Sequence, residues 1–311
     1  MLNVAVIYGG KSKEREVSLR SGKGVANALK AKGCNVKEID FTSMDFISSL
    51  QGVDLVYLAL HGRFGEDGRI QGLLDILEIP YVGSGVLASA LAMDKAKAKR
   101  IFDYVGIRVA KDLFVQIEDK ERLNFDAIEE DFGFPLVVKP NQEGSTIGLS
   151  IVKNKSELKE AINHAFTFDK QILIEEFISG TEVTVAVLET ASEIQALPII
   201  EIIPNKNQYY DYESKYAPGG SDHIIPARIN KETEGLLKKW AIEAHRQLGC
   251  ETLSRVDFII PSDGSLPVIL EVNTLPGMTE TSLYPDAAKA IGLSYEDIVY
   301  KLVEITLNKQ K

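Results

Sequence analysis

Hydrophobic and polar positions in the first part of the chain follow the two periods that buried strands and amphipathic helices produce. Residues 4–8, 35–40 and 53–60 are short, mainly apolar runs, and each is predicted to form a strand. Residues 17–32 carry small and apolar side chains at helical spacing and stop at Gly33, which predicts a helix between the first two strands. Strands that alternate with helices indicate a parallel sheet with right-handed crossovers.

Polar and glycine residues follow two of these strands directly. Gly9 and Gly10 come after the first strand, and His61 comes after the third. Ligands of parallel sheets bind beyond the carboxyl ends of the strands, so we expect a binding crevice there. Glu14 and His61 are candidates to face it. Taken alone, Glu14 is equally compatible with an ordinary surface acid, and His61 with a histidine that has only a structural role.

The pattern changes near residue 93. A basic helix leads into two strands at 134–139 and 149–153, which are joined by the glycine-rich segment 140–148. A helix over 156–166 and a strand over 171–177 follow. This order predicts a small α+β unit. We expect most of the charge run from Lys95 to Arg100 to be a solvated helix face, with one side able to reach a ligand.

The last part of the chain predicts a third unit. Strands are expected at 182–188 and 194–203, a helix at 231–248, and a hairpin at 254–273 ahead of C-terminal helices. Residues 204–229 have no sustained period, and so long an irregular loop is usually a lid or a binding loop. We therefore expect α/β and α+β units divided as 1–92, 93–180 and 181–311.

Composition narrows the class of protein. The chain has 311 residues with 35 basic and 45 acidic side chains, a net charge of −10, which argues against nucleic acid as a partner. Its two cysteines fit no metal or disulfide pattern. No apolar stretch approaches the length of a membrane span, and the first residues carry no secretion signal, so we expect a cytoplasmic protein without a membrane partner.

Two glycine motifs fail as nucleotide fingerprints. Residues 10–12 resemble the end of a phosphate loop, but Ala5 stands where the first glycine of that loop belongs. Residues 83–88 fit a loose dinucleotide pattern, but its acidic partner Asp103 falls in a predicted helix. The sequence therefore does not favour a nicotinamide site.

The predicted hairpin carries a candidate metal site. Arg255 and Asp257 share one face of its first strand, and Glu271 and Asn273 share one face of the second. If the turn has an odd number of residues, Asp257 lies opposite Glu271. Two carboxylates and an amide oxygen suit a hard cation such as Mg²⁺. The alternative is the solvated polar face of an edge hairpin.

The glycine-rich segment carries a candidate phosphate site. Its backbone N–H groups can cradle phosphate oxygens, and Lys139 at its base and Lys95 before it supply point charges. The alternative is an ordinary mobile loop beside surface lysines.

Together these segments resemble the D-alanine–D-alanine ligases of the ATP-grasp superfamily, in order and over nearly the whole chain. The segments are residues 9–18, 61–68, 83–85, 93–95, 139–145, 210–216, 255–257 and 271–279. The resemblance implies a three-domain ATP-grasp fold with an N-terminal Rossmann-like parallel sheet. It also implies a cytoplasmic homodimer that joins two D-alanines for peptidoglycan synthesis.

The resemblance assigns roles to individual residues. Asp257, Glu271 and Asn273 resemble the ligands of two Mg²⁺ ions, for which Mn²⁺ is a substitute. The positions that match ATP-binding residues are Lys95, Lys139, Glu175, Phe177, Ile178, Glu182 and Lys215. Phe177 stands where the family often has tryptophan, and both offer an apolar ring.

Further matches concern the two D-alanines and the chemistry. Glu14, Ser145 and Tyr216 resemble a hydrogen-bonded trio at the first D-alanine, and Ser282 and Leu283 resemble contacts to the carboxylate of the second. His61 is also expected to face substrate, and Arg255 and Gly277 join the catalytic set. Tyrosine at position 216 is what ligases making D-Ala-D-Ala carry, whereas phenylalanine there is associated with relatives that accept D-lactate.

The implied reaction has two steps. The γ-phosphoryl group of ATP is transferred to the first D-alanine, and the amine of the second attacks the acyl phosphate, with Arg255 stabilising the oxyanion. We expect the loop at 204–229 to close and exclude water, bringing Lys215 to the phosphates and Tyr216 to Ser145. Two alternatives stay open, which are a ligase with D-serine or D-lactate as acceptor and a nucleotide-binding module without ligase chemistry.

Overall fold

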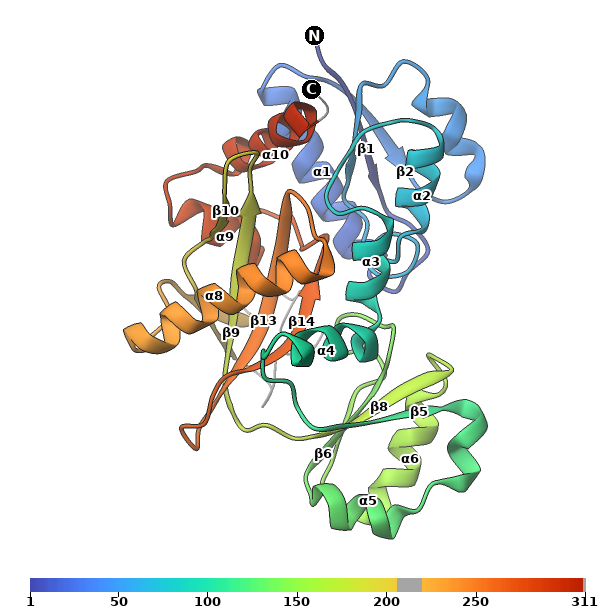
Figure 1. The fold of residues 1–311 in the computed structure, drawn as a ribbon. Coiled ribbons are helices and arrows are strands. Elements are labelled where there is room, and N and C mark those ends of the chain that lie inside the picture. The colour runs from blue at the N-terminus through green and yellow to red at the C-terminus, as the bar shows by residue number, and fades with distance from the viewer. Residues whose placement is uncertain (206–219, 310–311) are drawn as a thin grey trace.

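The computed structural model describes residues 1–205 and 220–309, and their strands form three sheets (Figure 1). The first sheet is parallel, as predicted, with the order β2-β1-β3-β4. Its strands are β1 (Asn3–Tyr8), β2 (Asn35–Asp40), β3 (Leu55–Leu58) and β4 (Tyr81–Val82). The helices along this part of the chain are α1 (Arg15–Ala31), η1 (Met44–Leu50), α2 (Arg69–Ile76) and α3 (Val86–Met93), and α3 packs into the core of the third sheet. Because β1 and β3 are neighbours, the segments after Tyr8 and Leu58 leave the same edge of the sheet side by side.

The second sheet is antiparallel and forms the part of the molecule that lies below α4 in Figure 1. Its order is β5-β8-β6-β7, and the predicted pairing of the strands on either side of the glycine-rich segment is confirmed. Its elements are β5 (Asp112–Gln116), η2 (Ile117–Arg122), α5 (Phe125–Phe132), β6 (Leu136–Pro140), β7 (Ser150–Val152), α6 (Lys155–Ala165) and β8 (Gln171–Glu176). Strand β5 and helix α5 were not predicted.

The third sheet is also antiparallel, in the order β12-β11-β9-β13-β14, with β10 added beside β9. Its strands are β9 (Gly180–Glu189), β10 (Ile194–Ala196), β11 (Ile200–Pro204), β12 (Ser221–Ile224), β13 (Leu253–Pro261) and β14 (Val268–Asn273). Helix α8 (Lys231–Leu248) packs against β9 and β13.

Two sequence expectations about this sheet are wrong. The single strand expected at 194–203 is two strands, because Pro198 between them has no N–H to continue a ladder. The segment 204–229 is not irregular throughout its described part, since β12 pairs with β11 from Ser221 to Ile224. Hydrogen bonding to a neighbouring strand, rather than hydrophobic alternation, makes this segment extended.

Helices join the three sheets into one molecule. Helix α4 (Lys95–Tyr104) packs against α8, and its residues Ala98 and Phe102 belong to the core of the third sheet. Helices α9 (Leu283–Lys289) and α10 (Tyr295–Lys309) belong to the core that also contains α1 and β1, so the end of the chain returns to the first sheet (Figure 1). The boundaries at 92/93 and 180/181 stay a prediction.

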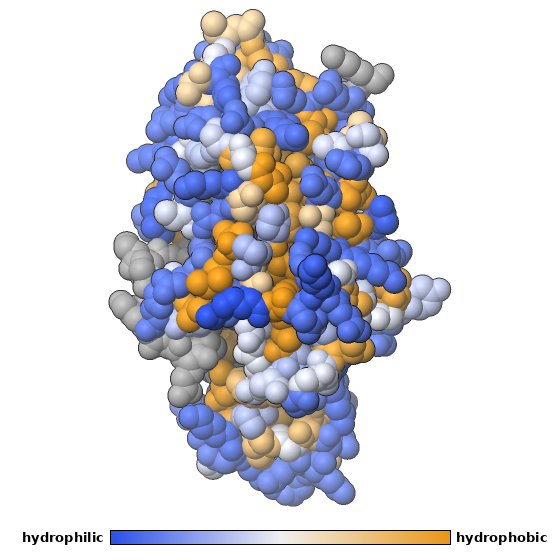
Figure 2. Space-filling view, turned by 90° about the vertical axis from the view of Figure 1, so that its left-hand side faces the viewer, coloured by the Kyte–Doolittle hydropathy of each residue, from blue (hydrophilic) through white to orange (hydrophobic). Residues whose placement is uncertain are grey.

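The face of the molecule drawn in Figure 2 is mostly hydrophilic. On the face drawn in Figure 2, hydrophobic residues come to the surface mainly along the middle, and hydrophilic residues cover the rest. Among the helices of residues 1–205 and 220–309, none combines the length and the apolarity that crossing a bilayer requires.

Candidate active site

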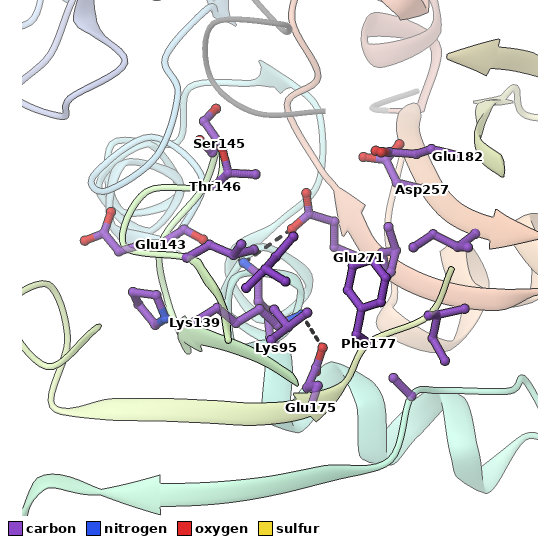
Figure 3. Close-up of a pocket in the computed structure, with 18 of the residues that line it drawn as sticks. Lys95, Lys139, Glu143, Ser145, Thr146, Glu175, Phe177, Glu182, Asp257 and Glu271 are labelled. Carbon is purple, nitrogen blue, oxygen red and sulfur yellow. Dashed lines mark hydrogen bonds and ion pairs between the residues drawn. The ribbon is translucent and has the colours of Figure 1, made fainter. Parts of the chain in front are cut away.

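Two neighbouring clefts contain most of the predicted site residues. The inter-sheet cleft lies between the second and third sheets and is lined from Lys139 on β6 to Glu271 on β14 (Figure 3). The N-terminal pocket lies between the loops of the first sheet and the loop that follows β14, and is lined from Glu14 to Leu283. Ser145 and Glu271 line both cavities. A molecule in one cleft can therefore meet a molecule in the other at these two side chains.

The hairpin of β13 and β14 carries the acids as predicted. Asp257 is directly opposite Glu271, and Arg255 is opposite Asn273. Immediately after Asp257 the register shifts by one residue, so a β-bulge preserves the facing acids on one side of the hairpin. Val256 and Phe258, which alternate with Arg255 and Asp257, are fully buried.

Asp257 is held by three partners. Arg255 donates from Nε at 2.9 Å and from a terminal nitrogen at 2.7 Å, which is a bidentate arrangement. The Thr184 hydroxyl donates at 2.5 Å, and the side-chain amide of Asn273 donates at 3.0 Å. The carboxylate is therefore fixed and charge-balanced within the hairpin.

The residues fit a divalent cation by the chemistry of their donors. Two carboxylates and an amide oxygen come from facing positions of one hairpin, and both carboxylates line the inter-sheet cleft. Within residues 1–205 and 220–309 there is no cluster of three or more His, Cys, Asp or Glu side chains that could hold a metal. A cation here would need further oxygen ligands from water or from a bound anion, as is usual for Mg²⁺.

Two lysines enter the inter-sheet cleft from different elements (Figure 3). Lys95, at the start of α4, donates to the Glu143 carbonyl at 2.7 Å and lies 3.3 Å from Glu271. Lys139, on β6, lies 2.7 Å from Glu175. Both ammonium groups are mostly buried, with 11% and 12% of the side chain exposed, so they present positive charge inside the cleft.

Glu175 lies on the floor of the same cleft and bridges two lysines, Lys139 and Lys99. Burial alone raises the pKa of Glu175, but the two ammonium groups outweigh burial and hold that pKa below its usual range. Lys99 is itself buried, so the expectation that the charge run of α4 is mostly a solvated face is wrong at this position.

Three further predicted residues line the inter-sheet cleft next to β8 and β9. They are Phe177, Ile178 and Glu182. Phe177 is 37% exposed, so its ring is accessible from the cleft. Together with Ile151 and Leu270 it gives one end of the cleft an apolar lining suited to a flat ring.

A hydrogen bond between distant loops closes the N-terminal pocket. The Ser145 hydroxyl, in the glycine-rich segment, donates to the Glu14 carboxylate, and both residues are buried. Ser145 has a φ of 50°, a left-handed conformation that is rare for serine and is stabilised here by this contact. A Cβ atom on neighbouring Gly144 would lie 3.1 Å from Glu14, so glycine permits the close approach.

Buried titratable groups line the wall of the same pocket. Burial lowers the pKa of His61, whose Nε2 lies 3.3 Å from the Ser21 hydroxyl, so its imidazole is neutral. Burial, and then the nearby charge of Glu14, raise the pKa of Glu66. Glu66 accepts a hydrogen bond from the Gly62 N–H at 2.7 Å. The motif 61–68 contains Glu66, but its place in the pocket was not predicted.

The opposite wall of the pocket comes from the segment before α9. Ser282 precedes the helix and Leu283 begins it, and both line the pocket. The Thr279 N–H donates to the Ser282 hydroxyl at 3.0 Å, and a Cβ atom on Gly277 would lie 3.0 Å from the same oxygen. Backbone N–H groups at the start of a helix have no partner within it, which suits this wall to an anion.

Two predicted residues, Lys215 and Tyr216, lie outside the described residues. The sequence analysis did not name His223 or Thr281, which also line the pocket. His223, on β12, lines the N-terminal pocket with its Nδ1 2.6 Å from Asp286. The segment 204–229 was expected to be a lid or a binding loop, but its sequence did not single out His223.

Two family models match this chain. The model described as D-ala D-ala ligase N-terminus matches residues 37–84, and that described as D-ala D-ala ligase C-terminus matches residues 101–304. A D-alanine–D-alanine ligase of Halalkalibacterium halodurans is 57% identical, over 99% of this chain and 100% of its own length. A D-alanine–D-alanine ligase of Pelotomaculum thermopropionicum is 48% identical, over 98% of this chain and 97% of its own length.

Solved structures agree in fold. The D-alanine–D-alanine ligase from Bacillus anthracis, complexed with ATP, matches with a TM-score of 0.84 at 33% identity, over 100% of this chain and 99% of that one. The VanG D-Ala:D-Ser ligase from Enterococcus faecalis matches with a TM-score of 0.83 at 33% identity, over 98% of this chain and 99% of that one. The expected ATP-grasp fold is thereby confirmed. Because two family models and near-complete relatives account for almost all of its length, the chain belongs to the D-alanine–D-alanine ligase family.

Proposed function

We propose that this protein is an ATP-dependent D-alanine–D-alanine ligase that supplies D-Ala-D-Ala for peptidoglycan. The observation that carries the proposal is the meeting of two clefts at Ser145 and Glu271. One cleft has an apolar end and two lysines, which suit a nucleotide, and the other is small and lined by acids and a helix start, which suit amino acids. A relative 57% identical over its whole length carries the same name.

The nucleotide binds in the inter-sheet cleft. Its ring lies against Phe177 and Ile178, Glu182 takes the ribose, and Lys95 and Lys139 contact the phosphates. Lys215, which lies outside the described residues, is expected to join them on the resemblance to the family. Phosphoryl transfer needs charge neutralisation and alignment more than covalent help from the protein, and buried ammonium groups provide both.

Asp257, Glu271 and Asn273 would hold two Mg²⁺ ions, or Mn²⁺ in their place. When bound, these ions neutralise phosphate charge and align the reacting groups. Until then Arg255 balances Asp257 and Lys95 lies next to Glu271, so the acids do not repel each other. Removal of divalent ions with a chelator abolishes turnover.

The first D-alanine binds in the N-terminal pocket with its ammonium group at Glu14, which Ser145 orients. His61 lines the wall behind it as a neutral imidazole. The second D-alanine binds with its carboxylate at Ser282 and Leu283 and beside Gly277. Its neutral amine attacks the acyl carbon of the first, and Arg255 stabilises the negative oxygen that forms. The C–O bond to the phosphoryl group then breaks, inorganic phosphate leaves, and the amine gives up a proton as the peptide bond forms. Tyr216, which lies outside the described residues, is expected on the resemblance to complete the trio with Glu14 and Ser145 and to help exclude water.

The test is release of inorganic phosphate from ATP and Mg²⁺. D-alanine supports release and L-alanine does not, and the product is D-Ala-D-Ala by mass. Phosphate release that is independent of D-alanine, or nucleotide binding without any dipeptide, would refute the ligase proposal. A competition assay with D-alanine, D-serine and D-lactate distinguishes the alternative acceptors. We expect D-alanine to be the acceptor in most of the product.

We further propose that the protein is a homodimer in the cytoplasm, on the resemblance to its family. Light scattering coupled to size-exclusion chromatography measures the mass in solution. A mass of about twice the 34.3 kDa chain is expected, and a monomer over the working concentration range would refute it.

A further inference from the structure

A chain of charged side chains leads from the inter-sheet cleft into the protein behind it. Lys99, on α4, lies 2.6 Å from one oxygen of Glu175 and 3.0 Å from Asp112. The other Glu175 oxygen lies 2.7 Å from Lys139. The side chains of Lys99 and Asp112 are each only 3% exposed, and that of Glu175 is 6% exposed. Glu175 and Lys139 line the cleft, whereas Lys99 and Asp112 do not.

The register of the second sheet explains why a cation is needed here. Asp112 on β5 and Glu175 on β8 are directly opposite each other, and like charges in that position repel. The Lys99 ammonium contacts both carboxylates and removes the repulsion. Arg100 also pairs with Asp112 at 3.2 Å, but it is 61% exposed and does not contact Glu175.

Glu175 in turn positions the lysine of the cleft. With one oxygen held by Lys99, the carboxylate keeps its other oxygen turned to Lys139. Lys139 comes from the neighbouring strand β6, where Val137, two residues away, pairs with Glu175. Lys99, Glu175 and Lys139 thus form one line from helix α4 along one face of the sheet to the cleft wall.

We propose that Lys99 is a positioning residue, which fixes the Glu175 carboxylate and through it aims the Lys139 ammonium at the phosphates of the nucleotide. It touches no substrate itself. Helix α4 then affects nucleotide binding through two lysines. Lys95 lines the cleft, and Lys99, one helical turn later, lies behind it and acts through Glu175. The proposal rests on the proposed binding of ATP in this cleft.

The test measures binding of the non-hydrolysable analogue AMP-PNP and of adenosine, with Mg²⁺ present, by titration calorimetry. Lys99→Met weakens the binding of AMP-PNP by about tenfold or more, which is the scale of a lost charge-assisted hydrogen bond. The affinity for adenosine, which has no phosphate, changes by less than about twofold, the usual limit for independent sites. Lys97→Met, an exposed lysine on the same helix, leaves both affinities unchanged.

A double-mutant cycle separates positioning from a merely structural role. Lys139→Met weakens AMP-PNP, and adding Lys99→Met to it causes less than about a twofold further loss, because the group being aimed is already gone. Full additivity of the two losses overturns the proposal. Equal losses for AMP-PNP and adenosine also overturn it.

Variants at Asp112 control for folding. Lys99→Met leaves two buried acids with one cation fewer, which can destabilise the sheet. Lys99→Met with Asp112→Asn removes one charge of each sign, and we expect it to fold and to bind AMP-PNP as weakly as Lys99→Met alone. Asp112→Asn alone keeps the affinity of the unmodified protein. Recovery of affinity in the double variant would refute the route through Glu175.

The test does not depend on turnover. If the unmodified protein binds AMP-PNP but makes no D-Ala-D-Ala, the ligase proposal fails and the cycle can still be measured. If the ligase is active and Lys99→Met binds AMP-PNP normally, the positioning role alone is refuted.

Discussion

The two facing acids of the hairpin are held in different ways. Asp257 is almost fully buried and takes hydrogen bonds from Thr184, Arg255 and Asn273. Glu271 is 20% exposed and lines both clefts. A bound cation would therefore find Asp257 already fixed, whereas Glu271 is the acid placed where nucleotide and amino acid meet.

Replacing Glu271 by glutamine tests its role as a charge partner. Turnover falls by at least ~10²-fold, the scale of losing one strong electrostatic contact in a transition state. The measurement is D-alanine-dependent phosphate release under saturating substrates. Asp263→Asn, in the exposed turn of the same hairpin, makes the same charge change and keeps full activity. An active Glu271→Gln variant would contradict the assignment.

Replacing Tyr216 by phenylalanine tests acceptor choice. Tyr216 lies outside the described residues, so this prediction comes from the family pattern alone. We expect the variant to accept D-lactate more readily relative to D-alanine while its affinity for AMP-PNP is unchanged. Product ratios in a competition assay measure the effect, and an unchanged ratio would count against the role of Tyr216.

At the scale of single elements, capping signals set helix bounds accurately. Helix α8 runs from Lys231 to Leu248, as predicted. The Asn230 side chain accepts a hydrogen bond from the Thr233 N–H at 2.8 Å, and Gly249 ends the helix in the left-handed conformation with a φ of 73°. Both signals are local, so they can be read without knowing what the helix packs against.

Loss of the Asn230 cap lowers stability. Asn230→Ala leaves the Thr233 N–H without its side-chain acceptor and costs about 1 kcal/mol in the free energy of unfolding. Urea denaturation followed by circular dichroism measures the change. Asn230→Ser retains an acceptor oxygen and stays close to the unmodified protein. Equal destabilisation by both variants would show that the cap is not the cause.

At the scale of the whole molecule, histidines buried in different units link stability to pH. Burial lowers the pKa of His245, which is fully buried with its Nδ1 2.8 Å from Ser254 and its Nε2 3.1 Å from Glu189. The folded protein therefore keeps this imidazole neutral at a pH where the unfolded chain protonates it. Stability linked to His245 is full above the unfolded pKa of about 6.5 and is lost as the pH falls below that value.

Thermal unfolding of the unmodified protein and of His245→Gln isolates this contribution. As the pH is lowered from 7.5 to 5.5, the unmodified protein loses stability relative to the variant, by at most about 1.4 kcal/mol per pH unit for one proton. His164→Gln, at an exposed histidine, gives no such difference. A difference between the unmodified protein and His245→Gln that is independent of pH would refute the linkage.

The sequence by itself determined what depends on near neighbours along the chain. Three features depend only on local sequence, and each was predicted. They are the strands β1 and β2 from their hydrophobic period, helix α8 with its caps, and the polar face of the hairpin from the alternation of Arg255 with Val256. The division of 194–203 into two strands was missed even though Pro198 is a local signal.

Only the tertiary structure decided which groups from distant segments meet. Lys99 is buried because α4 packs over two acids that the register of β5 and β8 sets opposite each other, and no pattern within α4 distinguishes it from exposed Lys97. His223 reaches the pocket because β12 pairs with β11. Burial and charge pairing depend on the packing of whole elements, and the local sequence does not contain that information.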